Sequence, residues 1–100
     1  TKTLLSSKNA PTAIACFNDL QAIGAQAAIQ DLGAKVALVG YDNTYLSSLS
    51  QISLTSVDPG NREIADKCAD FLLEDDVNLK LTHFSTPTLV ARSSSAKGVQ

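Results

Sequence analysis

Two short apolar runs on either side of a helical segment constrain the fold of this chain most strongly. Residues 12–17 and 35–41 each have the length and composition of a strand that is buried on both faces. Residues 20–32 contain no turn-forming run and end before Gly33, which predicts a helix. A strand, a helix and a strand in succession form a βαβ unit, whose two strands are parallel. The sequence therefore predicts an α/β fold, a parallel sheet flanked by helices.

The remainder of the chain predicts fewer regular elements. Residues 1–7 read as the end of a helix, residues 45–50 as a loop or single helical turn, and residues 52–57 as a further strand. Residues 61–74 form an amphipathic pattern, followed by a polar linker over 75–80. Residues 82–92 look extended, and Pro87 favours a sheet edge or a bulge. The small polar residues 93–100 predict a frayed tail.

Composition excludes several classes of function. The chain has 100 residues, 44% of them hydrophobic, and a formal net charge of −2, which fits a globular domain and argues against direct binding of nucleic acid. Cys16 and Cys68 lie in apolar segments and, with the single His83, have no metal-ligand spacing. Glycine-rich phosphate loops and a G-x-S-x-G nucleophile motif are absent. We therefore expect no enzyme activity, no cofactor and no metal, and no segment that spans a membrane.

A candidate ligand site lies where the two predicted strands end. In an open parallel sheet, ligands bind beyond the carboxyl ends of the strands. The first strand ends at Phe17-Asn18-Asp19 and the second at Tyr41-Asp42-Asn43, so each end carries an aromatic ring, a carboxylate and an amide. From the residues alone, two readings stay open. The polar residues contact a ligand, or they cap a helix and form a turn, which are the more common uses of Asn and Asp.

Five blocks, in order, resemble one known family. They are PTAIACFNDLQAIGA at 11–25, VALVGYDNT at 36–44, ISLTSVDP at 52–59, REIADKCADFLL at 62–73 and LVARSSS at 89–95. Each is similar to a block of the LacI/GalR transcription regulators, and together they cover nearly the whole chain. The resemblance implies the C-terminal part of a periplasmic-binding-protein-like (type I) effector domain.

The resemblance also implies a division of the chain between two subdomains around a ligand cleft. Residues 1–56 would belong to the C-terminal subdomain. Residues 57–80 would cross to the N-terminal subdomain as a helix, residues 81–95 would return as a strand, and residues 96–100 would form a tail. The start at Thr1, without an initiator Met or an apolar leader, suggests a piece of a longer protein.

Site residues follow from the same resemblance. Asp19 matches a family position that contacts the effector, and Asn18 would brace the turn. Phe17 and Asp42 would line the cleft. The helix after the Asn-Asp pair lies at the dimer interface in the family, which assigns interface contacts to Ala22, Ala25, Gln26 and Ile29.

The resemblance implies the effector-binding and dimerisation part of a bacterial LacI-type regulator in the cytoplasm. Its effector would be a small molecule, a sugar or a nucleoside-like compound. It would form a homodimer and reach DNA only through a domain absent from this chain. A periplasmic sugar-binding protein of a transport system is the alternative, and an enzyme on a doubly wound sheet is a third hypothesis.

Overall fold

A computed structural model describes residues 1–74 and 82–96 of the chain. Its elements are α1 (Lys2–Leu5), β1 (Ala13–Ala15), α2 (Asp19–Asp31), β2 (Ala37–Tyr41), the 3-10 turn η1 (Tyr45–Ser48), β3 (Thr55–Asp58), α3 (Asn61–Leu73), β4 (Thr88–Val90) and the 3-10 turn η2 (Ser93–Ser95). The predicted polar linker and the last four residues lie outside the described residues.

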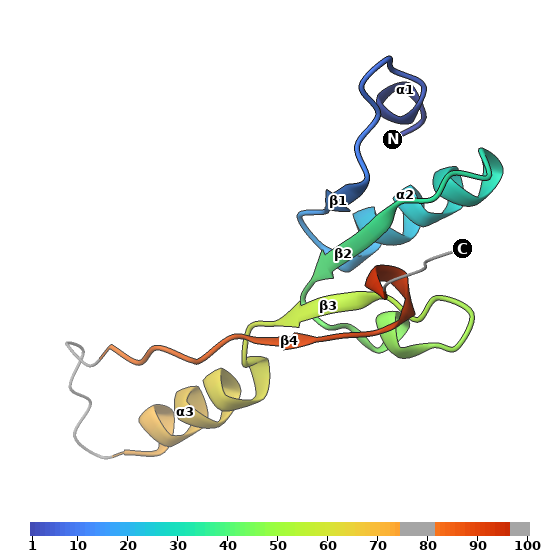
Figure 1. The fold of residues 1–100 in the computed structure, drawn as a ribbon. Coiled ribbons are helices and arrows are strands. Elements are labelled where there is room, and N and C mark those ends of the chain that lie inside the picture. Colours follow the sequence, from blue (N-terminus) through green and yellow to red (C-terminus); the bar gives the residue numbers. More distant parts are fainter. Residues whose placement is uncertain (75–81, 97–100) are drawn as a thin grey trace.

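The four strands form one sheet in the order β1-β2-β3-β4 (Figure 1). β1 and β3 both run parallel to β2, which confirms the predicted βαβ unit. The predicted parallel sheet flanked by helices is confirmed for β1, β2 and β3, and β4 adds an antiparallel edge strand beside β3, so the sheet as a whole is mixed. The reason is that the chain leaves the sheet after β3, forms α3 and re-enters from the same end. β4 begins directly after Pro87, whose missing N–H suits an edge strand.

α2 covers one face of the sheet and supplies half of the core. Its buried residues Ala22, Ala25 and Ile29 pack against the sheet-side residues Val36, Leu38 and Leu54. The small alanines allow the helix backbone to approach the sheet closely. Gly33, with a φ of 60°, ends the helix in the left-handed conformation, as the sequence predicts.

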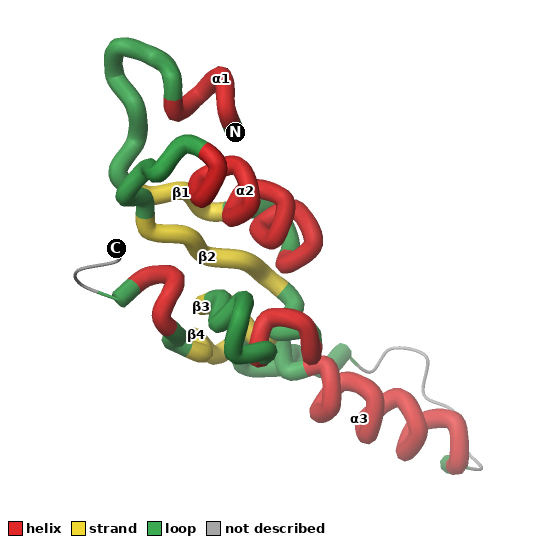
Figure 2. Tube along the Cα trace, turned by 90° about the vertical axis from the view of Figure 1, so that its right-hand side faces the viewer, coloured by secondary structure: helices red, strands yellow, loops and turns green. Residues whose placement is uncertain are grey.

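α3 lies away from this core. It extends beyond the ends of β3 and β4 and contains no buried residue (Figures 1 and 2). The predicted amphipathic helix is confirmed, but its apolar face has no partner within the described residues. The radius of gyration is 17.7 Å, whereas a compact domain of this length has one of about 13 Å. The chain is therefore elongated, with a core at one end only.

Residues Ser93–Ser95 are more ordered than the sequence predicts. Ser94 in η2 is buried, and its hydroxyl accepts from Thr55 N at 2.8 Å and donates to Leu38 O at 2.6 Å. These bonds fasten η2 onto β2 and β3. The prediction of a frayed tail is therefore wrong for Ser93–Ser95, because a small hydroxyl side chain satisfies buried backbone groups that the sequence pattern does not reveal.

Candidate functional site

An open hollow lies at the carboxyl ends of β1 and β2. It has a volume of about 400 Å³ and is lined by Cys16, Phe17, Tyr41 and Asp42, and pockets for small molecules span roughly 300–1,000 Å³. Phe17 is 82% exposed, so its ring is available to another molecule. The structure thus brings Phe17 and Asp42 together, as expected where adjacent parallel strands end at one edge. Ligand binding in this hollow stays a prediction.

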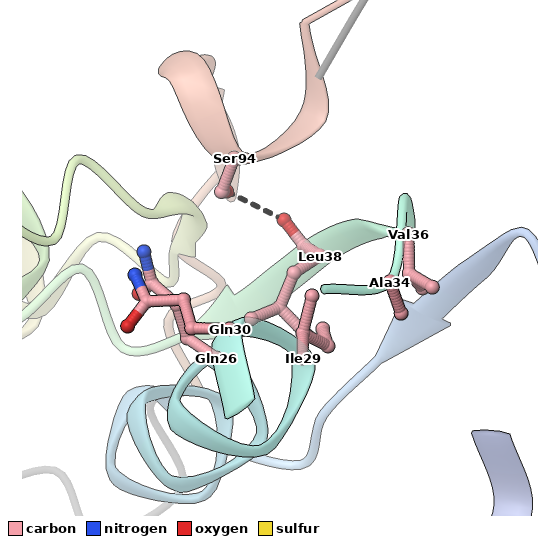
Figure 3. Close-up of a pocket in the computed structure, with 7 residues that line it drawn as sticks. All are labelled: Gln26, Ile29, Gln30, Ala34, Val36, Leu38 and Ser94. Carbon is pink, nitrogen blue, oxygen red and sulfur yellow. Dashed lines mark hydrogen bonds between the residues drawn. The ribbon is translucent and has the colours of Figure 1, made fainter. Parts of the chain in front are cut away.

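A second hollow lies between α2 and the strand β2, beside Ser94 (Figure 3). Its volume is about 90 Å³. That is below the range of roughly 300–1,000 Å³ for small-molecule pockets. Apolar residues form most of its wall, and the amides of Gln26 and Gln30 lie together to one side in Figure 3. This hollow is too small for an effector, and we assign it no ligand.

Asp19 is buried, with an exposed fraction of 1%. Its Oδ2 accepts from Thr44 N at 2.7 Å and Thr44 Oγ1 at 2.9 Å, and its Oδ1 accepts from Ser56 Oγ at 2.5 Å. Both carboxylate oxygens are thus occupied within the chain. Because Asp19 is buried, a ligand could reach this carboxylate only if the residues that cover it moved. The expected contact of Asp19 with an effector therefore stays a prediction, and the observed geometry assigns Asp19 a structural role.

Asn18 caps α2. Its Oδ1 accepts from the backbone N–H of Gln21 at 2.9 Å, which satisfies one of the free donors of the first helical turn. Asn18 was expected to brace the turn, and in the structure its side chain does so by capping the first turn of α2. Its cap fixes the start of α2, and so it fixes the position of the neighbouring Asp19.

Three of the four residues assigned to a dimer interface are buried within the core of this chain. Ala22, Ala25 and Ile29 are buried against the sheet, and Gln26 donates from Nε2 to Ile52 O at 2.9 Å. Ala22, Ala25 and Ile29 thus face the sheet, whereas Gln26 is half-buried, and the assignment of these residues to a dimer interface stays a prediction. The opposite face of α2 does carry exposed apolar or small residues, which are Leu20, Gly24 and Ala27.

The turn that follows β2 has an uncommon backbone. Asp42 has a φ of 98° and Asn43 a φ of 45°, conformations that non-glycine residues seldom adopt and that Asn and Asp tolerate best. Asp42 N donates to Val57 O at 2.9 Å, and Asn43 N donates to Ser56 Oγ at 3.0 Å. Bonds from β3 therefore hold the backbone of the hollow's wall in a strained shape.

Arg92 follows β4 and binds the turn after β2. Its guanidinium donates to Leu54 O at 2.7 Å, Ser47 Oγ at 3.1 Å and Asn43 Oδ1 at 2.8 Å. Thr44 and Ser56 were not predicted, because a Thr in a turn and a Ser in a strand carry no signal of their partner. The sequence signal for Arg92 is its position as a cation directly before three serines, Ser93–Ser95.

The described residues give little support to catalysis. Burial raises the pKa of the Cys16 thiol above its ordinary value, so the thiol is a poor nucleophile at neutral pH. His83 Nε2 lies 2.8 Å from Glu63 Oε1 on the surface, away from the hollow. Within residues 1–74 and 82–96, no group of three His, Cys, Asp or Glu side chains could hold a metal, and no helix is long and apolar enough to cross a membrane.

Sequence and structure comparisons identify the class of protein. The family model for the periplasmic binding protein-like domain matches residues 2–95. The chain belongs to this family.

Known relatives narrow the class to one group of regulators. The chain is 31% identical over 101 residues to the HTH-type transcriptional repressor PurR of Vibrio vulnificus, covering 94% of this chain and 30% of that protein. It is 35% identical over 75 residues to PurR of Aliivibrio salmonicida, covering 71% and 22%. The chain thus spans less than a third of the length of these curated relatives, which are transcriptional repressors.

Solved structures agree with this assignment. A LacI-family transcriptional regulatory protein from Corynebacterium glutamicum superposes with a TM-score of 0.82 at 33% identity, over 95% of this chain and 39% of that one. A Lac repressor dimer bound to operator and the anti-inducer ONPF superposes with a TM-score of 0.78 at 29% identity, over 94% and 35%. The chain is part of the effector domain of a LacI/GalR-type regulator.

Proposed function

We propose that this chain supplies one wall of an effector pocket in a LacI-type transcription regulator, and that the wall is the hollow of Phe17, Tyr41 and Asp42. The observation that carries the proposal is the convergence of two aromatic rings and a carboxylate at the carboxyl ends of adjacent parallel strands. This is the edge at which open α/β sheets bind ligands.

The lining chemistry favours an effector with a flat apolar face and hydrogen-bond donors. Phe17 and Tyr41 offer ring faces, and the Asp42 carboxylate accepts charge-assisted bonds from hydroxyl or N–H groups. A sugar and a nucleoside-like compound both meet this description. No cationic side chain lines this hollow within the described residues, so this wall favours a neutral effector over an anionic one.

We assign DNA binding and pocket closure to other parts of the regulator. The chain has a net charge of −2, and nucleic-acid binding needs a positively charged face. A LacI-type repressor acts on DNA, so we propose that the regulator works in the cytoplasm. Effector binding would favour one arrangement of the two subdomains and thereby change affinity for the operator.

Dimerisation is proposed through the exposed face of α2, which is the face of Leu20, Gly24 and Ala27. Leu20 is 66% exposed, and a side chain added at Gly24 would meet open space. Small residues beside a leucine let two helices approach closely. A Lac repressor with 29% identity to this chain is itself described as a dimer. A second copy of the regulator is therefore the proposed partner of this face.

A thermal-shift screen of the complete sensing domain against sugars, nucleosides and purines tests the effector pocket. An effector present at 100 times its Kd stabilises the protein by about 2.7 kcal/mol, and a tenfold loss of affinity removes about 1.4 kcal/mol of this. We expect Phe17→Ala and Asp42→Asn each to lose about half of the effector-induced shift. Asn also tolerates the left-handed backbone of position 42, so this variant should still fold.

Phe84→Ala is the matched control, because Phe84 is as exposed as Phe17 but does not line the hollow. An effector shift that stays unchanged in both Phe17→Ala and Asp42→Asn would rule out this hollow as the pocket. Asp19→Ala addresses the predicted direct contact separately. If Asp19 only holds the turn, Asp19→Ala lowers the melting temperature without effector more than it lowers the effector-induced shift.

A further inference from the structure

The wall of the hollow is connected both to the end of β3, where the chain leaves the sheet, and to the segment that follows β4. Asp42 lines the hollow, and Asn43 is the next residue. Asn43 Nδ2 donates to Asp58 Oδ2 at 2.9 Å, while Asn43 Oδ1 accepts from Arg92 Nη2 at 2.8 Å. One amide side chain thus holds the end of β3 and the segment after β4 at the same time.

Asp58 extends the connection from the turn after β2 to the start of α3. Asp58 is the last residue of β3, and its Oδ1 accepts from Gly60 N at 2.8 Å, directly before α3 begins at Asn61. Gly60 itself has a φ of 81°. The carboxylate therefore has one oxygen on the turn of the hollow and the other on the turn that directs α3 away from the sheet. A movement of either turn changes a bond to the other.

Arg92 makes the arrangement stiff. Its Nη1 is held by Leu54 O and Ser47 Oγ, so its Nη2 presents a fixed donor to Asn43. Asn43 can keep both bonds only while its side chain stays in one orientation. That orientation maintains a backbone in which Asp42 and Asn43, two successive residues, both have a positive φ, a conformation that is unfavourable for residues other than glycine. The strained turn is thus stable only in the presence of its partners on β3 and after β4.

We propose that Asn43, Asp58 and Arg92 form a coupling cluster that transmits occupancy of the hollow to the direction in which the chain crosses to α3. Asn43 and Arg92 are positioning residues, since neither lines the hollow. An effector that contacts Asp42 favours one geometry of the turn, and the Asn43–Asp58 bond passes this preference to the Gly60 turn. This inference rests on the proposed function, because it needs an effector in the hollow.

A donor–acceptor exchange in the full-length regulator tests the cluster. Asn43→Asp places two carboxylates against each other and breaks the Asn43–Asp58 bond, while the bond to Arg92 is kept. Asn43→Asp combined with Asp58→Asn restores a donor and an acceptor in exchanged positions. The measured quantity is the ratio of the Kd for operator DNA with and without the sugar, nucleoside or purine that gives the largest thermal shift in the screen above, and an allosteric protein shows a ratio of about 5- to 150-fold. The control is Arg62→Ala, which removes an exposed charge on α3.

We expect Asn43→Asp to reduce this ratio at least about threefold, and the double variant to recover at least half of it. Effector Kd and melting temperature are measured in parallel, so a purely structural effect is recognised as a loss of stability at an unchanged ratio. An unchanged ratio in Asn43→Asp, or no recovery in the double variant, would overturn the proposal. A wild-type regulator without any effector response contradicts the proposed function instead, and the two failures are thus distinguishable.

Discussion

At the residue scale, the same chemistry that suits a ligand site also builds a protein interior. An Asp after a strand can accept bonds from a ligand or from its own chain, and Asp19 accepts three from Thr44 and Ser56. A buried carboxylate without partners would be expensive, so full satisfaction of both oxygens is what permits its burial. Asp42, half-buried at the hollow, remains available for a partner outside the chain.

Asp58 makes stability depend on pH. The hydrogen bond from Asn43, followed by the one from Gly60 N, lowers the pKa of the Asp58 carboxyl below its ordinary value of 3.8. Its contribution to stability is therefore complete above that ordinary value and is lost as the pH falls through the lowered pKa. We expect the difference in unfolding free energy between wild type and Asp58→Asn to be constant from about pH 7 to about pH 5 and to shrink below about pH 4.

Urea unfolding of the complete sensing domain at a series of pH values measures this difference. Asp31→Asn serves as the control, since Asp31 is an exposed partner of Lys2 on another part of the surface. A difference that grows as the solution becomes more acidic would contradict the assigned direction of the pKa shift.

At the scale of elements, the close approach of α2 to β2 depends on a glycine. A Cβ added at Gly40 would collide with Asp19 Oδ1 and would lie 3.0 Å from Leu54 Cδ2 and 3.2 Å from Asp19 Cα. Gly40 lies in β2 directly beside Ser56 of β3. The absence of a side chain there leaves room for the carboxylate that joins α2 to the turn after β2.

Gly40 is buried, and Gly40→Ala should therefore destabilise the fold. We expect a loss of about 1–3 kcal/mol in unfolding free energy, because overpacking displaces Asp19 from its partners. Chemical denaturation checks this value, with Gln30→Ala as the control, because Gln30 is exposed near the end of α2. Alanine at position 30 should be neutral or slightly stabilising, because alanine has the highest helix propensity. Equal losses in both variants would contradict the packing argument.

At the scale of the whole molecule, the chain has a core at one end and unpartnered apolar surface at both. Leu72 and Leu73 of α3 are each 83% exposed, and Leu20 of α2 is 66% exposed. Apolar surface of this extent is where protein partners usually bind. We expect the remainder of the sensing domain to cover α3, and a second copy to cover the face of Leu20.

Leu20→Glu in the full-length regulator tests the second assignment. A charge at the centre of an apolar interface is left without a partner on either copy, so we expect the dimer Kd to rise at least about tenfold, which corresponds to about 1.4 kcal/mol. Sedimentation velocity over a concentration series measures this change. Gln21→Glu adds the same charge one residue along the helix and is the control. A dimer that survives Leu20→Glu unchanged would place the interface elsewhere.

The sequence by itself determined the local elements and the family. Runs of apolar residues at strand length, the Asn18 cap and Gly33 each depend on neighbours in the chain, so βαβ order and the carboxyl-end position of the hollow were predictable. The five ordered blocks predicted the regulator family, and the comparisons confirm it.

Only the tertiary structure decided which residues face inward and which partners they meet. Ala22, Ala25 and Ile29 belong to the core because α2 turns that side to the sheet, and apolar residues all around the helix gave no preference between its faces. The hydrogen bond between Asn43 and Arg92 spans 49 positions of sequence. β4 is antiparallel to β3 because the chain re-enters the sheet at Thr88, beside Asp58, where it left. Pairings over such separations depend on the three-dimensional path of the backbone, which local patterns do not contain.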